Sequence, residues 1–230
     1  MSLKFPRLLF IALACAVLAG RAAGEVIEVT SLAGLAQLAA RDHQQIKVRP
    51  GTYRMADYLV EDVLKEIRAG VDRKISRPPV PMLVFRGHDN RFDLQDVVLE
   101  IDTSLYAKLP QGGYTRCLIV AGNRNHFSGL TIRNTGPNQG SNGNILSVAG
   151  EGNTLENVTL QVHGSAPYGY GDLLGKGGPN LMPLQKQSGI QVLGSGTTLR
   201  RSTWMPLPAL VTARLPRMAP NHSGGLPVVV

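Results

Sequence analysis

Apolar and polar residues alternate in four short segments of the chain, each of which ends at a glycine. The four residues before Gly87, Gly122, Gly150 and Gly194 read LVFR, LIVA, LSVA and IQVL. Successive side chains of a β-strand point to opposite faces, so the first and third residues of each segment share a face. The pattern predicts four strands with one buried face, which holds the pairs Leu83/Phe85, Leu118/Val120, Leu146/Val148 and Ile190/Val192.

A second apolar position follows each glycine after five residues, at Phe92, Phe127, Leu155 and Leu199. Another short alternating segment comes next, at residues 97–99, 130–132, 158–160 and 202–204. The first copy fits the others only with a two-residue insertion. Each copy therefore predicts two short strands with a bend between them. A unit of this kind buries its apolar face only when copies stack, so the repetition predicts stacked repeats.

The spacing of the repeats is uneven, because the four glycines lie 35, 28 and 44 residues apart. Insertions on the loops of a stacked repeat produce this kind of variation. An antiparallel sandwich with chance repetition is the competing interpretation, and the scarcity of Asn-Gly hairpin turns disfavours it. Asn125 and Asn153 share one offset from their glycines, and we expect their side chains to bond turn backbone groups.

The residues before the repeats predict a short helix between two strands. Ser31 is a suitable N-cap for an apolar stripe at helical spacing, formed by Leu32, Leu35 and Leu38. The flanking strands are expected at residues 26–29 and 46–48. Residues 55–81 then interrupt the pattern as an insertion, with a helix expected within residues 57–70 and a proline-rich exit.

The repeats follow a strand, a short amphipathic helix, a second strand and the tetrapeptide Pro-Gly-Thr-Tyr at residues 50–53. In the first three repeats, an asparagine follows the glycine by three positions. This order resembles the right-handed parallel β-helix proteins of the pectin-lyase-like superfamily, over residues 25–204. The resemblance implies an all-β fold, a right-handed parallel β-helix (solenoid) with a short N-terminal capping helix. In that family the helix closes the open end and shields the first strand edges.

Residues 1–24 have the features of a secretory signal peptide. Lys4 and Arg7 precede an apolar run that ends at small residues, and the run is too short for a permanent membrane span. The expected location is secreted or periplasmic, without stable membrane insertion after cleavage. Cys15 lies in a segment similar to a lipoprotein cleavage box, but the match is poor.

Cleavage after residue 24 would remove three basic residues and lower the net charge from +8 to +5. The basic residues do not form a block, so nucleic acid is not an expected partner. Cys117 would be the only remaining cysteine, which excludes an intramolecular disulfide. Its position at the start of a strand indicates a small buried side chain.

Residues 205–230 do not continue the repeat. This segment has no acidic residue, contains five prolines and shows neither strand nor helix periodicity. We interpret it as an irregular tail, either disordered or the product of a truncated or out-of-phase gene.

The longest departure from the repeat, residues 163–189, holds the candidate site. Aromatic rings stack on sugars and cations pair with uronate carboxylates, so an acidic polysaccharide is the expected partner. The proposed substrate-binding residues are Tyr168, Tyr170, Asp172 and Lys186. Members of the resembled superfamily often cleave uronate polymers by β-elimination, which needs a base, a carboxylate partner and a proton donor. The candidate catalytic residues are Lys176, His163 and Arg133, with Tyr168 or Tyr170 as donor.

Structural roles compete with these assignments. The loop can pack along the flank of the repeats with its lysines solvated, and His163 can bond a turn. Arg133 shares a column with Glu100 and Gln161, which favours a surface ladder or ion pair. The outward side chains of the first strand column do not form a charged groove, so the outer side of the second strand column is the better place for a binding site.

Cofactors are not evident from the sequence. The Cys and His residues have no zinc spacing. Lyases of the superfamily that the chain resembles can use calcium. The acidic residues that could bind it lie in one repeat only, at Asp89, Asp93, Asp96, Glu100 and Asp102. The few carboxylates also disfavour a glycoside hydrolase. The sequence predicts an exported protein that binds or processes an acidic extracellular polysaccharide, with a lyase as the enzymatic form. The alternatives are a non-catalytic glycan-binding or adhesion solenoid, or an inactive fragment.

Overall fold

The computed structural model describes residues 25–111, 113–136, 143–163 and 187–206. The expected signal peptide, most of the candidate loop and the tail from residue 207 onward lie outside the described residues. Within the described part, the chain is mostly β-structure, and every strand pairing is parallel. The antiparallel sandwich is therefore wrong for this part of the chain.

The described strands form two parallel sheets. The smaller sheet has the order β11-β8-β6-β4 and consists of β4 (Pro79–Phe85), β6 (Tyr114–Val120), β8 (Gly143–Val148) and β11 (Gln187–Val192). The main path of the larger sheet consists of β1 (Val26–Val29), β2 (Gln45–Val48), β5 (Arg91–Asp102), β7 (His126–Thr135), β10 (Thr159–Val162) and β13 (Thr203–Pro206). Beside this path lie β3 (Gly51–Arg54), β9 (Thr154–Glu156) and β12 (Thr198–Arg200).

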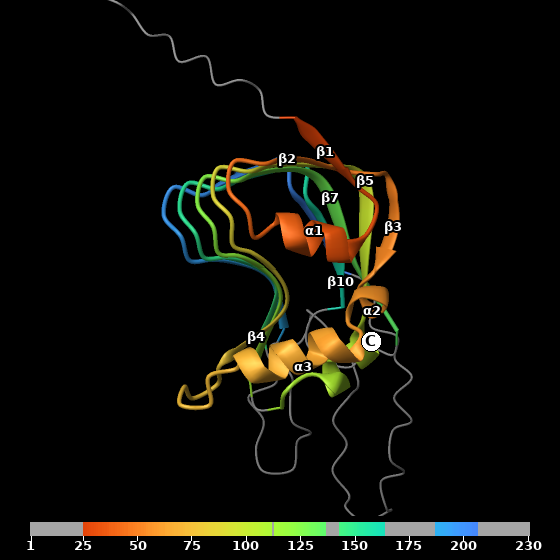
Figure 1. Cartoon of the computed structure of the whole chain (residues 1–230), viewed down its shortest axis with the longest axis vertical. Coiled ribbons are helices and arrows are strands. Elements are labelled where there is room, and N and C mark those ends of the chain that lie inside the picture. The colour runs from red at the N-terminus through yellow and green to blue at the C-terminus, as the bar shows by residue number, and fades with distance from the viewer. Residues whose placement is uncertain (1–24, 112, 137–142, 164–186, 207–230) are drawn as a thin grey trace, which may run out of the picture.

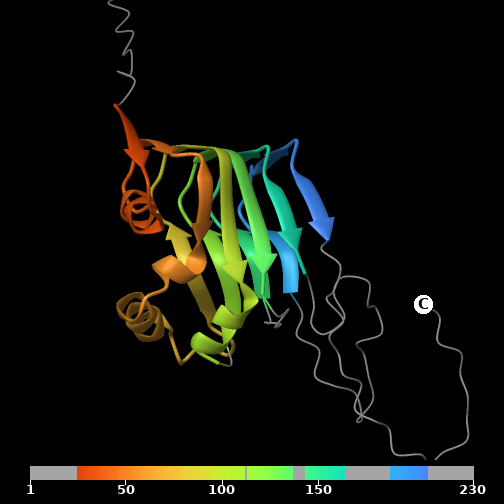
Figure 2. The same ribbon diagram turned by 90° about the vertical axis from the view of Figure 1, so that its right-hand side faces the viewer.

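Successive repeats stack in register, as the columns of the sequence predict. Leu83, Leu118, Leu146 and Ile190 are paired in turn across the smaller sheet. Phe92, Phe127, Leu155 and Leu199 are paired in turn across the larger one. Figure 1 shows the repeats nested behind one another, and Figure 2 shows the same stack from the side. This arrangement is compatible with a parallel β-helix.

Aromatic side chains fill the centre of the first two repeats. The rings of Phe92 and Phe127 stack with centroids 4.6 Å apart, and the ring of Phe85 meets each of them edge-on at 5.1 Å. All three side chains are buried. The three rings therefore make the core continuous between the two sheets. Edge-to-face and offset-stacked arrangements are both favourable for aromatic pairs.

The glycines that mark the repeats stand where the backbones approach most closely. A Cβ atom on Gly122 would lie 1.8 Å from the carbonyl oxygen of Gly87. Gly150 and Gly194 each have the same relationship to the preceding glycine, at 2.0 and 1.9 Å. No larger residue fits at these positions without moving the backbone. The repeated glycine of the sequence is therefore a packing requirement of the stack.

The helices cover one end and one flank of the stack. Helix α1 (Leu32–Leu38) begins after Ser31, whose side chain accepts the amide of Gly34 at 3.1 Å, so the predicted helix and its N-cap are confirmed. It lies across the end of the stack (Figures 1 and 2) and buries its leucines there. The insertion forms α2 (Met55–Tyr58) and α3 (Glu61–Gly70), where one helix was expected. A 3-10 helix, η1, spans Thr103–Lys108.

Two element boundaries differ from the sequence prediction. β5 and β7 each run through the expected bend as one strand, and the predicted two-residue insertion is a register shift between Asp93 and Val97. β13 continues through Pro206 and keeps its register with β10. The parallel pairing therefore extends two residues beyond the boundary expected at Trp204.

Candidate functional site

Arg133 lies in a row of polar side chains on the outer face of the larger sheet. Its Nε donates to the Gln161 side-chain oxygen at 3.0 Å, and its Nη1 lies 3.5 Å from a Glu100 carboxylate oxygen. The other Glu100 oxygen lies 3.8 Å from Nε of Arg54. These residues share one register position on neighbouring strands. The surface ladder that the sequence indicated for Arg133 is confirmed.

His163 directly follows β10 and is buried, with 5% of its surface exposed. Its main-chain amide donates to the Asn134 side-chain oxygen at 3.3 Å, and its Nδ1 is buried with no hydrogen-bond partner among the described residues. Burial lowers the pKa of the His163 imidazole, which favours the neutral ring. A neutral imidazole suits a base, but a general base must reach the proton that it removes. The burial favours the structural role.

A line of buried polar groups runs from Asn134 into the core. The Asn134 amide donates to the Ile101 carbonyl at 3.4 Å and to the Tyr106 hydroxyl at 3.5 Å. That hydroxyl lies 3.7 Å from the sulfur of Cys117. Burial raises the pKa of the Cys117 thiol to about 12, so the thiolate is suppressed at neutral pH. The small buried side chain predicted for Cys117 is confirmed, and a nucleophilic role is disfavoured.

The other residues of the predicted site, Tyr168, Tyr170, Asp172, Lys176 and Lys186, lie outside the described residues. No hydrogen bond or ion pair joins the two that are described, Arg133 and His163. Arg133 and Asn134 are neighbours on one strand, so their side chains point to opposite faces. His163 contacts Asn134, whereas Arg133 is held in the outer row.

Three of the five carboxylates considered for calcium, those of Asp89, Glu100 and Asp102, have other partners. Asp89 receives two hydrogen bonds from Arg124, at 2.7 and 2.8 Å, and Asp102 caps η1 by accepting the Ser104 amide at 2.8 Å. Glu100 lies between two arginines of the polar row. No group of three or more His, Cys, Asp or Glu side chains that could hold a metal ion occurs among the described residues.

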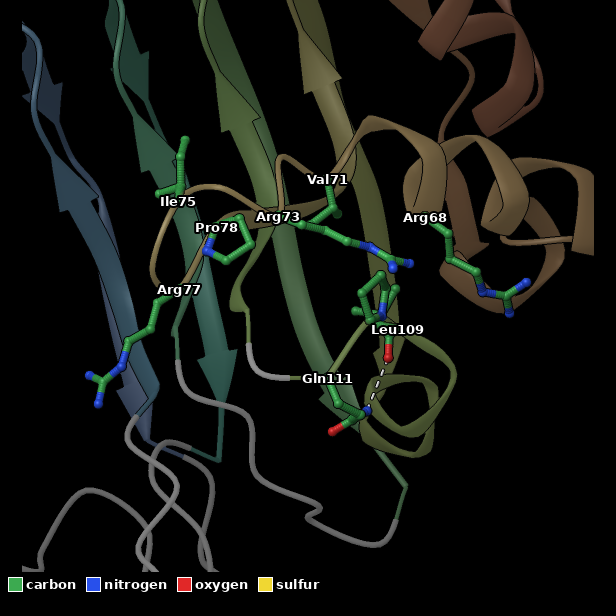
Figure 3. Close-up of a pocket in the computed structure, with 9 residues that line it drawn as sticks. Arg68, Val71, Arg73, Ile75, Arg77, Pro78, Leu109 and Gln111 are labelled. Carbon is green, nitrogen blue, oxygen red and sulfur yellow. Dashed lines mark hydrogen bonds between the residues drawn. The ribbon is translucent and has the colours of Figure 1, made fainter.

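A pocket that the sequence did not suggest opens beside α3. It has a volume of about 460 Å³, and its lining comes from the end of α3, the segment that leads to β4 and the turn after η1. The lining residues are Arg68, Val71, Arg73, Ile75, Arg77, Pro78, Leu109, Pro110 and Gln111. Figure 3 shows Arg73 between Arg68 and Arg77, with its guanidinium extended toward Leu109.

The pocket combines positive charge with an apolar floor. Arg68 is held by Glu61, whose carboxylate lies 2.7 Å from its Nη1. No ion pair joins Arg73 or Arg77 to a carboxylate within the described ranges, and none of the nine lining residues is acidic. The Gln111 amide donates to the Leu109 carbonyl at 3.0 Å, which holds the turn after η1 (Figure 3). The Arg73 guanidinium is therefore available to an anion beside the apolar residues, whereas the Arg77 side chain extends away from Leu109 (Figure 3).

The composition of residues 68–77 is the signal that could have located this pocket. The segment reads RAGVDRKISR and places four basic residues beside one acid. Its partner, the turn at Leu109 and Gln111, lies about one repeat later in the chain. Only the stacking of the repeats brings the two segments together, so spacing along the sequence gives no indication of the contact.

Comparisons with known proteins do not assign a family. No protein-family model matches the chain, and no curated protein is significantly similar to it. In the part of the chain that the structure describes, no helix is long and apolar enough to cross a membrane.

Proposed function

We propose that the chain is an exported, right-handed parallel β-helix protein of the pectin-lyase-like superfamily, and that it binds an acidic polysaccharide. The stacked parallel strands and the helix over one end are compatible with that architecture. The secretory features of residues 1–24 support export to the periplasm or medium.

The arginine-lined pocket is the observation that carries the proposal. A guanidinium group donates two parallel hydrogen bonds to a carboxylate, and uronic acids present one carboxylate per sugar. Arg73 supplies such a group beside Leu109, and Arg77 supplies a second one at the outer edge of the pocket (Figure 3). Val71, Pro78 and Leu109 offer an apolar surface to the sugar ring. A neutral polysaccharide would leave both guanidinium groups without a charged partner.

Binding is better supported by the described residues than cleavage is. Arg133 is held by Glu100 and Gln161, and His163 is buried. β-Elimination is the enzymatic form of the proposal, and the remaining groups assigned to it, Lys176 and the tyrosines, belong to the loop outside the described residues. A non-catalytic glycan-binding protein needs only the pocket.

The binding proposal can be tested with two polymers that differ in charge. We expect the purified chain to bind polygalacturonate in a titration and not to bind dextran. The double variant Arg73→Gln/Arg77→Gln should bind about two- to thirtyfold more weakly, because each of the two exposed ion pairs contributes about 0.2–1 kcal/mol. Added salt should weaken wild-type binding, since it screens exposed charges.

The matched control is the double variant Arg41→Gln/Arg91→Gln, which also removes two charges, from exposed arginines that do not line the pocket. Its affinity should equal that of the wild type. Equal weakening in the two double variants would indicate attraction by net charge and would refute the pocket. Ultraviolet absorbance of unsaturated product, with and without calcium, tests the enzymatic form in the same samples. Product would establish elimination, and binding without product would leave a glycan-binding protein.

A further inference from the structure

Arg116 is a partly buried charge on the outer face of the smaller sheet. It lies on β6 between Thr115 and Cys117, which are both buried. Cys117 belongs to the core, so the alternation of side chains along a strand places Arg116 on the opposite face. The Arg116 Nε is buried and has no hydrogen-bond partner among the described residues. No ion pair within the described ranges joins its guanidinium to a carboxylate.

The side chains next to Arg116 in the sheet do not accept its hydrogen bonds. Its register partner on β4 is Pro81, whose side chain has no polar atom. Its register partner on β8 is Asn144, whose side-chain oxygen accepts the Ser188 hydroxyl. A buried N–H group without an acceptor costs free energy, and the cost is larger when the group is charged. Arg116 therefore calls for an acceptor that its neighbours in the sheet do not supply.

The polar side chains beside Arg116 form a neutral network. The Asn144 amide nitrogen donates to the Ser147 hydroxyl at 3.3 Å and to the Gln191 side-chain oxygen at 2.6 Å. Ser147 lies between Leu146 and Val148, which both belong to the core, so the network is on the outer face as well. None of its side chains is ionisable. This part of the face therefore combines one positive charge with neutral hydrogen-bonding groups.

The charge of this face selects the class of ligand. A carboxylate carries one negative charge and accepts two parallel hydrogen bonds from a guanidinium, so it matches a single arginine. A divalent anion such as sulfate would retain an uncompensated charge. Ser188 is exposed and Gln191 is partly exposed, and their side chains can bond hydroxyl groups of the same ligand. A sugar acid has both the carboxylate and the hydroxyl groups.

We propose that Arg116 binds the carboxylate of a sugar acid on the outer face of the smaller sheet, with Ser188 and Gln191 beside it. Arg116 is not among the residues that line the arginine-lined pocket. The site is therefore independent of the proposed function. A chain in which Arg73 and Arg77 took no part in polysaccharide binding would still bind a sugar acid at Arg116.

Thermal unfolding of the full chain in sodium galacturonate tests the site. The Arg73→Gln/Arg77→Gln background removes the contribution of the pocket, and sodium chloride keeps the ionic strength constant. Equimolar galactose is the reference, because it has the hydroxyl groups without the carboxylate. The Tm should exceed this reference by about 3–6 °C when galacturonate is at ten times its dissociation constant, measured by calorimetric titration. Acetate should bind more weakly than galacturonate, and sulfate should have no more effect than chloride.

Two substitutions of Arg116 separate binding from a structural role. Arg116→Met removes the charge and the unsatisfied Nε, so without ligand its Tm should be at least that of the parent, and its response to galacturonate should be lost. Arg116→Lys keeps the charge but lacks the planar guanidinium, so it should bind galacturonate severalfold more weakly. Arg200→Met is the matched control, because it removes the same charge from an exposed arginine on β12. It should respond like the parent.

Several results would overturn the proposal. Equal Tm values in galacturonate and galactose at every concentration would exclude the site. A response that Arg116→Met retains would place the carboxylate on another part of the chain. Equal responses to galacturonate and sulfate would indicate attraction of any anion. A lower Tm of Arg116→Met without ligand would show that the chain itself supplies the partner of Arg116.

Discussion

The side-chain oxygen of Asn125 accepts the main-chain N–H of Asn90 at 2.9 Å, although 35 positions separate the two residues. The next repeat reproduces the bond, because the Asn153 oxygen accepts the Asn125 N–H at 2.9 Å. Each side-chain amide also donates to the carbonyl of a glycine one repeat earlier, Gly87 for Asn125 and Gly122 for Asn153. The asparagines therefore join the turns of neighbouring repeats in a ladder.

Asn125→Leu should destabilise the chain strongly. The side chain is 1% exposed, and its loss leaves the Asn90 N–H and the Gly87 carbonyl buried without these partners. An unsatisfied buried group costs about 1–3 kcal/mol, so we expect a loss of about 3 kcal/mol in the free energy of unfolding. Urea denaturation followed by circular dichroism measures this loss.

Asn123→Ala is the control for the ladder. Asn123 lies two residues away, is partly exposed and accepts one hydrogen bond, from the Glu151 amide at 2.9 Å. Water can replace that bond, so the expected loss is at most about 1 kcal/mol. Equal losses in the two variants would show that the buried ladder has no special contribution.

Gly122→Ala should prevent normal stacking of the second repeat on the first. The added Cβ would lie 1.8 Å from the Gly87 oxygen and 2.8 Å from the Arg86 oxygen, and both are backbone atoms that cannot rotate away. We expect a loss of about 3 kcal/mol or more, or failure to fold, as for severe overpacking. Thermal unfolding of the purified variant measures the effect.

The control substitution is Gly70→Ala, at the end of α3. A Cβ there would meet no atom within 4 Å, and the backbone does not have a positive φ angle. Alanine favours helix, so this variant should be as stable as the wild type or slightly more stable. If Gly122→Ala were equally harmless, the close approach of the repeats would not limit this position.

The stacked repeats could be predicted from the sequence because their determinants are local and periodic. Alternation in steps of two assigns the inward side chains of each strand, and a repeated glycine gives the register between copies. The positions of Gly87, Gly122 and Gly150 thus identify the equivalent turn of three successive repeats without any knowledge of tertiary contacts. Ser31 and the leucines after it locate α1 in the same way, through capping and helical spacing.

The exposure and partners of single side chains could not be predicted in this way. The burial of His163 depends on how the end of β10 packs beside Asn134, which lies 29 residues earlier. The arginine-lined pocket likewise joins Arg73 to the turn at Gln111 through tertiary contact. Sequence spacing carries no information on either contact, so the sequence pattern alone favours the long loop as the site.

Cys117 should resist thiol reagents in the folded chain. Its side chain is fully buried, and burial raises the pKa of its thiol to about 12, so almost no thiolate is present at pH 8. In a Cys15→Ala background, Ellman's reagent should give no signal without denaturant. One equivalent should react when the chain unfolds in guanidinium chloride. Rapid reaction of the native chain would show that the segment around β6 opens readily.

Stability should fall as the pH decreases from about 6.5. Burial lowers the pKa of His163 below its ordinary value of 6.5, so below that value the unfolded chain binds a proton that the folded chain does not. Protonation then favours the unfolded state. The contribution of His163 to stability is fully present above pH 6.5 and is lost as the pH falls toward the lowered pKa. Urea denaturation midpoints at pH 5.0, 5.5, 6.0, 6.5 and 7.0 measure the slope, in a range of about pH 5–7 where most carboxylates stay ionised.

His163→Gln should flatten that slope, because glutamine keeps a polar side chain but does not titrate. His43→Gln is the matched control, since it removes an imidazole of which 64% is exposed and leaves His163 in place. The slope should persist in the control. If His163→Gln retained the wild-type slope, another group would be responsible for it. If wild-type stability rose as the pH fell from 7 to 5 and His163→Gln abolished that rise, His163 would have to be protonated in the folded chain. Its buried Nδ1 would then need a partner that accepts a hydrogen bond.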